Sequence, residues 1–222
     1  MTDPRRSTDR QRAGRNVTIL TASPRAGGNS TALARACAQG AREAGERVTM
    51  INLNEWVGGG FLRDCRVCRD DRGRCTIDDR YSTLITDVVA PADAIVFASP
   101  LYFYAVAGVL KNFLDRLVCY LGASHSTDLS EALARQRTAL LITSEESYPG
   151  LLTGVAAQFH EMSRYLGQDL VAIVHGVGNH RGEVARDPDD PIETARRLGH
   201  ELFTRHTSDY TAATVRSHHV WG

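Results

Sequence analysis

Residues 21–31 constrain this chain more than any other stretch. They read Thr-Ala-Ser-Pro-Arg-Ala-Gly-Gly-Asn-Ser-Thr, follow a short apolar run at residues 17–20, and precede a helical pattern at residues 32–44. A strand that passes through small, hydroxyl-rich residues into a helix brings free backbone N–H groups and the positive end of the helix dipole to one point. This pattern predicts a phosphate-binding loop; the alternative is an ordinary helix N-cap.

The side chains of this loop favour phosphate over a simple cap. One capping residue would suffice, yet several hydroxyl and amide groups and one guanidinium cluster here: Ser23, Asn29, Ser30, Thr31 and Arg25. Gly27 and Gly28 let the backbone come close to a ligand. The loop has neither the Gly-Lys-Ser/Thr ending of a Walker loop nor a G-x-G-x-x-G pattern. Both absences argue against ATP hydrolysis and against a Rossmann dinucleotide site.

The composition is typical of a single soluble domain. With 222 residues, 42% hydrophobic and 23% charged, the chain is long enough for one well-buried domain and short for two. Basic and acidic residues number 26 each, so no net field recruits nucleic acid or an anionic membrane. The longest apolar runs, such as residues 94–98, are too short to span a bilayer. Five cysteines without a secretion signal indicate a reducing, cytoplasmic location.

The two ends differ from the rest. Residues 1–15 are polar and rich in arginine, which predicts a disordered basic arm. Residues 207–222 have few apolar side chains and form a C-terminal tail that is either disordered or reaches across a partner subunit. The folded domain is therefore expected over residues 16–206.

Strand and helix patterns alternate along that domain. Short apolar or β-branched runs predict strands, and apolar spacings of three and four residues predict helices. The expected strands are residues 17–20, 48–53, 94–98, 138–143 and 170–174. The expected helices are residues 32–44, 80–89, 106–121, 152–166 and 191–206. Such alternation predicts an α/β fold with an open, doubly wound parallel sheet.

A second loop, residues 99–104, follows the third expected strand. It combines a Ser-Pro turn with Tyr102, Phe103 and Tyr104. In open α/β sheets, ligands bind beyond the carboxyl ends of the strands, where the strand order reverses. Aromatic rings and exposed amides suit a flat heterocycle with polar edges; the alternative is a hydrophobic turn that packs on the next helix.

Two motifs carry a family resemblance. Ser23-Pro24-Arg25 followed by Gly28-Asn29-Ser30 is similar to a loop that reads approximately G-S-P-R-x-x-G-N-S/T, with Thr21-Ala22 in place of its first glycine. Residues 92–104 and 108–116 are similar to a second signature, approximately A-D-A-I-I-x-x-S-P-V-Y-W and then G-x-L-K-x-F-I-D-R, with Phe103 where Trp is frequent. Both motifs, in this order, resemble the flavodoxin-like NADPH-dependent FMN reductases.

The resemblance implies a flavodoxin-like sheet of five parallel strands in the order 2-1-3-4-5, with FMN as cofactor and NADPH or NADH as co-substrate. The residues implied to bind FMN are Ser23, Arg25, Asn29, Ser30 and Thr31 at the phosphate, and Pro100, Leu101, Tyr102, Phe103 and Tyr104 along the isoalloxazine. The implied reaction transfers hydride from NAD(P)H through FMN to a quinone, a flavin or another small electron acceptor by a ping-pong mechanism. FMN carries the chemistry, so no catalytic side chain is required.

Three further residues follow the fourth and fifth strands. Tyr148, His175 and His180 are candidates for orienting a substrate or donating a proton, and the alternative is that each is an ordinary surface or core residue. Two other functions share the same motifs: a flavodoxin-like electron carrier, which the neutral charge disfavours, and a supplier of reduced flavin to a monooxygenase. The resemblance and the crowding of aromatic residues on the loops also predict a homodimer.

A cysteine loop separates the chain from related iron–sulfur flavoproteins. Those proteins carry four compactly spaced cysteines here, whereas this chain has Cys65, Cys68 and Cys75, with Asp71 where a third close cysteine would stand. A four-thiolate cluster needs four thiolates, and zinc would need a ligand from elsewhere. We therefore expect a structural loop and no metal.

Overall fold

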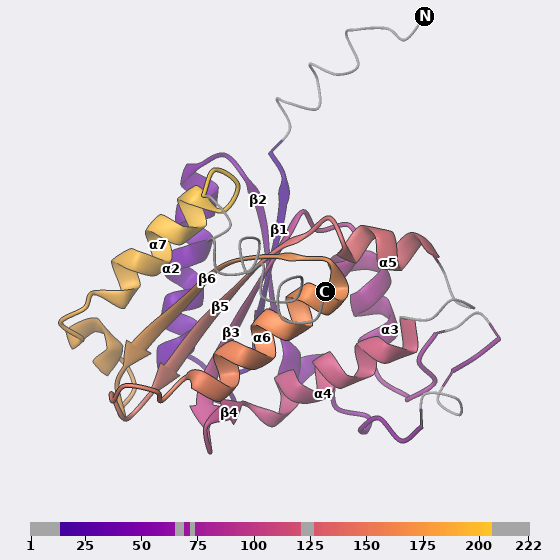
Figure 1. Cartoon of the computed structure of the whole chain (residues 1–222), viewed down its shortest axis with the longest axis horizontal. Helices are drawn as coiled ribbons and strands as arrows, with labels where there is room; N and C mark the ends of the chain where they lie inside the picture. The colour runs from indigo at the N-terminus through magenta and orange to yellow at the C-terminus, as the bar shows by residue number, and fades with distance from the viewer. Residues whose placement is uncertain (1–13, 65–68, 72–73, 121–126, 206–222) are drawn as a thin grey trace, which may run out of the picture.

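A parallel β-sheet forms the centre of the molecule in the computed structural model, which describes residues 14–64, 69–71, 74–120 and 127–205 (Figure 1). Its long strands are β1 (Asn16–Thr21), β2 (Arg47–Asn52), β3 (Ala94–Tyr102), β5 (Arg137–Ser144) and β6 (Asp169–Val177). They lie in the order β2-β1-β3-β5-β6, and all neighbours in this order are parallel. The expected order 2-1-3-4-5 is confirmed, because β5 and β6 are the fourth and fifth parallel strands along the chain.

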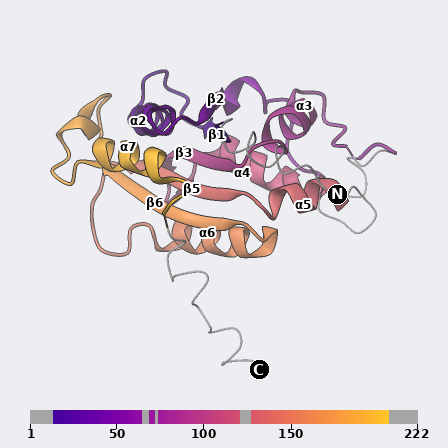
Figure 2. The ribbon, with the colours of Figure 1, turned by 90° about the horizontal axis from the view of Figure 1, so that it is seen from above.

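Helices cover both faces of this sheet (Figure 2). On one face lie α2 (Asn29–Glu43) and α7 (Pro191–Glu201); on the other lie α3 (Tyr81–Leu84), α4 (Gly108–Arg116) and α6 (Thr153–Leu166). Neighbouring residues of β3 point to opposite layers: Val96 packs with the α2 layer, and Phe97 packs against Phe113 of α4 and Phe159 of α6. The two-residue period of a strand therefore builds two cores, one on each face.

The first helix packs closely against the last because glycines meet backbone there. A Cβ added at Gly40 would lie 1.8 Å from the Arg196 carbonyl oxygen, and one added at Gly199 would lie 2.0 Å from the Cys37 carbonyl oxygen. The small residues on this face of α2 allow the close approach to α7. This contact fixes the axis of α2, whose N-terminus faces the carboxyl edge of the sheet.

Several elements differ from the sequence expectation. β3 continues past residue 98 to Tyr102 and turns into a two-residue strand, β4 (Ala105–Val106), which pairs antiparallel with it. α5 (Thr127–Leu133) lies in a polar stretch for which the pattern predicts no helix. The helix expected over residues 80–89 is α3 followed by a π-helical turn, Ile85–Val89. The helix expected over residues 106–121 is α4 followed by a 3-10 turn, Leu117–Tyr120.

The end of the expected N-terminal arm contacts the folded domain. Arg15, which the sequence assigned to the N-terminal arm, forms an ion pair with Glu46, and its guanidinium lies 3.7 Å from the centre of the Phe203 ring. The rest of the expected arm and the whole expected tail fall in residues 1–13 and 206–222, outside the described residues. Among the helices that the structure describes, none combines the length and apolar character of a membrane span.

Candidate functional site

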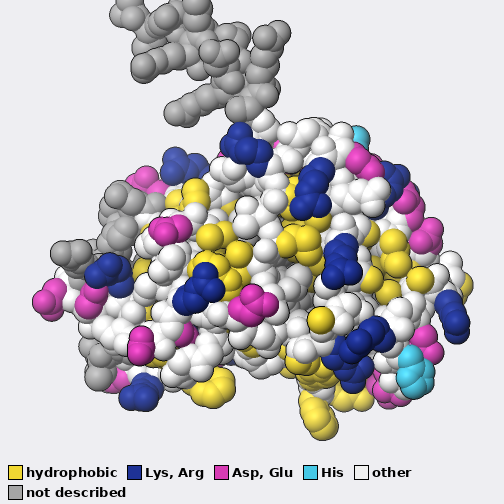
Figure 3. All heavy atoms as spheres, turned by 180° about the vertical axis from the view of Figure 1, so that it is seen from behind, with side chains coloured by type: hydrophobic (Ala, Val, Ile, Leu, Met, Phe, Trp, Pro, Cys, Tyr) yellow, Lys and Arg dark blue, Asp and Glu magenta, His cyan; other side chains and the backbone are white. Residues whose placement is uncertain are grey.

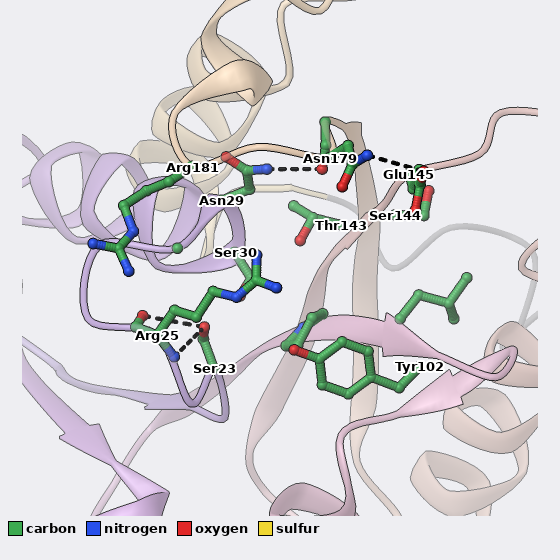
Figure 4. Close-up of a pocket in the computed structure, with 14 residues that line it drawn as sticks. Ser23, Arg25, Asn29, Ser30, Tyr102, Thr143, Ser144, Glu145, Asn179 and Arg181 are labelled. Atoms are coloured by element: carbon green, nitrogen blue, oxygen red, sulfur yellow. Dashed lines mark hydrogen bonds between the residues drawn. The ribbon is translucent and has the colours of Figure 1, made fainter.

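The segments at the ends of β1, β3, β5 and β6 meet at one edge of the sheet, because the carboxyl ends of parallel strands share an edge. There they line a cavity of about 180 Å³ (Figure 4). Its lining residues are Ser23, Arg25, Gly28, Asn29 and Ser30 after β1; Pro100, Leu101 and Tyr102 on β3; Thr143, Ser144 and Glu145 at the end of β5; and Gly178, Asn179 and Arg181 after β6. The cavity thus lies at the expected reversal of strand order, and it brings together both loops that the sequence singled out.

The N-terminus of α2 reaches this cavity without a side-chain cap. Gly28 precedes the helix, no described side chain caps its first turn, and that turn holds no acidic residue. The guanidinium groups of Arg25 and Arg181 lie on the side of the cavity where α2 begins, and Ser30 is 1% exposed (Figure 4). Backbone N–H groups, a hydroxyl and two cations form a donor set that fits a phosphate monoester.

Ser23 closes the phosphate loop on itself. Its Oγ accepts a hydrogen bond from the Arg25 N–H at 3.1 Å and donates to the Arg25 carbonyl oxygen at 3.2 Å. A Cβ at Gly28 would lie 2.7 Å from this Oγ, and Gly27 has φ +75°, where side chains are strained. The Ser23 hydroxyl therefore shapes the loop, and the two glycines permit its turn.

Asn29 joins two loops that are far apart in the sequence. Its amide nitrogen donates to the carbonyl oxygens of Gly178, at 2.8 Å, and His180, at 3.0 Å. Its amide oxygen accepts from the Gly182 N–H at 2.9 Å. The sequence assigned Asn29 to the phosphate; in the structure its side chain holds the loop after β6 and so positions Arg181.

A second cavity, of about 440 Å³, adjoins the first and shares Leu101, Tyr102, Ser144 and Glu145 with it. The remaining residues that line it are Phe103, Tyr104, Glu146 and Leu151. Its volume falls in the range of small-molecule sites, about 300–1,000 Å³. Aromatic and acidic side chains therefore line this cavity, whereas the cations lie at the start of α2.

The turn between β3 and β4 holds two aromatic residues in a strained conformation. Phe103 and Tyr104 have φ of 47° and 60°, in the left-handed region. Two-residue hairpin turns of this kind favour Asn-Gly, because a Cβ is disfavoured there. The Phe103 side chain is fully exposed, so burial does not offset the strain. Strain of this kind is typical of residues that contact a ligand.

Tyr104 also belongs to a small polar group at the mouth of the second cavity. Its hydroxyl donates to the Glu146 carboxylate at 3.3 Å. A hydrogen bond with Tyr148 and the negative charge of Glu146 raise the pKa of Tyr104. The hydroxyl therefore stays protonated at neutral pH, with its proton directed to the Glu146 carboxylate.

Four sequence candidates do not line either cavity: Thr31, Tyr148, His175 and His180. Thr31 lies in the first turn of α2, and Tyr148 is half-exposed near Tyr104. The backbone carbonyl of His180 accepts from Asn29. His175 lies on β6, where its Nε2 is 2.6 Å from the Oγ of Ser144, so it contacts a residue that lines both cavities.

Six residues that line the first cavity were not among the sequence candidates, and neither were Glu146 and Leu151 of the second: the six are Thr143, Ser144, Glu145, Gly178, Asn179 and Arg181. They lie at the end of β5 or just after β6, and a polar residue there is a weak signal by itself. The strand order was the signal that could have found them, because it places these ends beside the phosphate loop.

The cysteine loop shows a structural contact. Within the described residues, no three His, Cys, Asp or Glu side chains are placed to hold a metal ion; Cys65 and Cys68 lie outside those residues. Cys75 is buried, and its Sγ accepts from the Arg116 guanidinium at 3.3 Å. This contact ties the loop to α4.

The chain is similar in sequence to known flavoproteins. The family model described as NADPH-dependent FMN reductase matches residues 15–180. YwqN of Bacillus subtilis is provisionally named as an NAD(P)H-dependent FMN-containing oxidoreductase. It is 21% identical to this chain over 182 residues, which are 82% of this chain and 95% of that protein. FMN-dependent NADH:quinone oxidoreductase 2 of Idiomarina loihiensis is 27% identical over 154 residues, 61% of this chain and 62% of that protein. An iron-sulfur flavoprotein of Methanocaldococcus jannaschii is 31% identical over 102 residues, 44% of this chain and 49% of that protein.

A solved structure supports the fold. The Trp repressor binding protein from Bacillus subtilis superposes with a TM-score of 0.64 at 21% identity, covering 82% of this chain and 99% of that one. This likeness concerns the flavodoxin-like fold alone. The family match runs from residue 15 to residue 180, through all the described strands and the loops after β1, β3 and β5. The chain therefore belongs to the NADPH-dependent FMN reductase family.

Proposed function

We propose that this chain oxidises NAD(P)H with bound FMN and passes the electrons to a small acceptor such as a quinone or a free flavin. The observation that carries the proposal is the junction of two unlike cavities, one cationic at the start of α2 and one aromatic beside the β3–β4 turn. FMN has a terminal phosphate and a flat ring, so it needs both environments at adjoining positions. The quinone oxidoreductase among the relatives supports the class of acceptor.

The lining residues suggest how the chain holds FMN. Arg25, Ser30 and Arg181, together with the first N–H groups of α2, would bind the phosphate. Residues 100–104 and 143–145 would flank the ring. FMN supplies the two-electron redox chemistry when bound, and the chain supplies binding, orientation and a partly closed cavity.

The proposal includes a ping-pong order because the aromatic cavity would serve both substrates. The part of this cavity that the FMN ring leaves open would take the nicotinamide or an acceptor ring, and its walls include the exposed Phe103 and Tyr104. If both partners stack there, the oxidised nicotinamide must leave before the acceptor enters. In this ping-pong order, NAD(P)H first gives its hydride to FMN and leaves, and the acceptor then binds and takes the electrons.

The purified chain is expected to show FMN absorbance, or to gain it when FMN is added, and to be bleached by NADH or NADPH. FMN should bind more tightly than FAD because the cavity at α2 suits a terminal phosphate. Initial rates at varied NAD(P)H and 1,4-benzoquinone should give parallel double-reciprocal lines. A protein that binds no FMN at micromolar concentration contradicts the proposal. Bleaching without turnover of small acceptors indicates an electron carrier instead.

We further propose a homodimer that forms through an aromatic rim, defined as Tyr102, Phe103, Tyr104 and Tyr148. Their exposed fractions are 43%, 100%, 54% and 49%. Figure 3 shows hydrophobic side chains that project from the lower edge of the molecule next to basic ones. An exposed apolar group beside a ligand cavity is typical of an interface, and a partner's loop would also shield the cavity from water.

Sedimentation of the FMN-bound protein at micromolar concentration is expected to give a species of twice the 24.3 kDa chain mass. Phe103→Ser should shift the population toward monomer, because it removes the fully exposed ring of the rim. Tyr165→Ser is the matched control: Tyr165 is 70% exposed but lies on α6 and lines neither cavity. A 24.3 kDa species with full reductase activity would rule out a dimer-built site.

A further inference from the structure

Ser144 and His175 form a hydrogen-bonded pair at the wall of both cavities. Ser144 is the last residue of β5 and lines both cavities, and His175 lies on β6, the edge strand beside it. Ser144 Oγ is 2.6 Å from His175 Nε2 and 2.7 Å from the carbonyl oxygen of Glu146. The function proposed above uses Ser144 only as part of the segment 143–145 that would flank the ring, and it assigns no role to the Ser144 hydroxyl or to His175.

The two contacts fix the direction of the hydrogen bonds. A carbonyl oxygen can only accept, so the single hydroxyl proton of Ser144 points to Glu146. The Ser144 oxygen must then accept from His175, which assigns a proton to Nε2. The imidazole therefore faces Ser144 as a donor. It is not arranged as the base that activates a serine nucleophile, because such a base must present a lone pair to the hydroxyl.

The surroundings of His175 keep it able to exchange a proton. Burial lowers the pKa of His175, while the carboxylates of Asp187 and Asp189, in the segment before α7, act in the opposite direction. Asp187 is held in place by the Val177 N–H at 2.6 Å. The ring is half-buried on the edge strand, so it is largely neutral at neutral pH and remains in contact with solvent.

We infer that His175 and Ser144 form a proton relay for reduction of the acceptor, an inference that rests on the function proposed above. An acceptor reduced to a dihydro product takes two electrons and two protons. The hydride of NAD(P)H supplies both electrons and one proton, so solvent must supply the other. His175 takes that proton at Nδ1 and gives its Nε2 proton to Ser144 Oγ, while the Ser144 hydroxyl turns from the Glu146 carbonyl oxygen into the cavity and passes its own proton to the acceptor. Exchange with water then restores the Nε2–H form.

Stopped-flow measurement of the two half-reactions tests the relay. His175→Gln keeps an N–H donor for Ser144 but cannot take up one proton while it releases another, and Ser144→Ala removes the hydroxyl that Ser144→Thr retains. We expect His175→Gln and Ser144→Ala to slow reduction of 1,4-benzoquinone by about 100-fold, the lower end of the range of general acid catalysis. In His175→Gln, reduction by NAD(P)H should stay within about twofold of wild type, and Ser144→Thr should recover most of the benzoquinone rate that Ser144→Ala loses. His200→Gln, an exposed position on α7, is the control and should behave as wild type.

The choice of acceptor separates proton delivery from structural damage. Ferricyanide takes one electron and no proton, so its reduction should be nearly unaffected in His175→Gln, and in Ser144→Ala it should slow much less than benzoquinone reduction does. A second measurement needs no turnover: ¹⁵N spectra of the histidine rings should show His175 as the Nε2–H form at pH 7. In Ser144→Ala the Nε2–H tautomer of His175 should no longer be favoured over the Nδ1–H tautomer, because the oxygen that accepts its hydrogen bond is gone.

Each outcome decides between the relay and the proposed function. Equal slowing with benzoquinone and ferricyanide, an unchanged benzoquinone rate in His175→Gln, or an Nδ1–H form of His175 would overturn the relay and leave the proposed function standing. A wild-type chain that binds FMN but does not oxidise NAD(P)H would overturn both.

Discussion

Replacing Arg116 with methionine is expected to lower the free energy of unfolding by about 3–5 kcal/mol. Arg116 ends α4 and is fully buried; its guanidinium donates to the Asp79 carboxylate at 2.6 Å and 2.8 Å. It also lies 4.1 Å from the centre of the Tyr81 ring. Methionine keeps much of the packing but leaves the Asp79 side chain, 8% exposed, without its countercharge. An uncompensated buried carboxylate accounts for the size of the loss.

The control for this experiment removes both charges. Arg116→Met with Asp79→Asn should be more stable than Arg116→Met alone, because no ion is then left unpaired. Lys111→Met removes an exposed cation from the same helix, where Lys111 pairs with Asp115, and should cost less than about 1 kcal/mol. Urea denaturation followed by circular dichroism measures all three. If the free energy of unfolding of Arg116→Met lies within about 1 kcal/mol of the wild-type value, the Arg116–Asp79 ion pair does not stabilise the fold.

The same ion pair sets a pH dependence. Burial acts to raise the pKa of Asp79, but hydrogen bonds from Arg116 and from the N–H groups of Tyr81 and Gly59 outweigh it and hold the pKa below its usual value of 3.8. A carboxyl with a lower pKa in the folded state stabilises the fold above its unfolded pKa and loses this contribution as the pH falls through the folded pKa. The difference in stability between wild type and Arg116→Met should therefore shrink below about pH 4.

The sheet could be predicted because its signals are local and periodic. Residues 94–98 are apolar throughout because β3 is covered on both faces, and the small residues of α2 match its close contact with α7. The hairpin of β3 and β4 could not be predicted in this way. Its turn holds Phe103 and Tyr104 at positive φ, where the usual signal is Asn-Gly.

For the candidate site, the sequence could indicate only those lining residues that lie within a local motif. Ser23, Arg25 and Ser30 follow β1 directly, so one local pattern contains them and their neighbours. Asn29 was found as a residue, but its partner Gly178 lies 149 positions away, and no local pattern contains that contact. Arg181 reaches the cavity through the same long-range contact, which depends on the strand order rather than on the sequence around it.

Substituting Arg25 and Ser30 together by alanine is expected to weaken FMN binding by about 2–4 kcal/mol, or about 30- to 900-fold in Kd. Arg25 lines the cavity as a cation, and Ser30 is buried at the first turn of α2, where no described side chain competes for the backbone N–H groups. The double variant removes a charge-assisted hydrogen bond and a neutral one from the same phosphate. Fluorescence titration of FMN gives Kd for both proteins.

Riboflavin makes this loss specific to the phosphate, because it has the same ring without that group. Wild type should prefer FMN to riboflavin strongly, and the double variant should lose most of that preference while its affinity for riboflavin stays within about twofold of wild type. Arg35→Ala is the matched control: Arg35 is an exposed cation on α2 that does not line the cavity.

If the double variant retains the FMN preference, the phosphate binds elsewhere. If affinity for FMN and riboflavin falls equally, these residues support the loop instead of contacting the phosphate, since only a direct contact distinguishes two ligands that differ in that group alone.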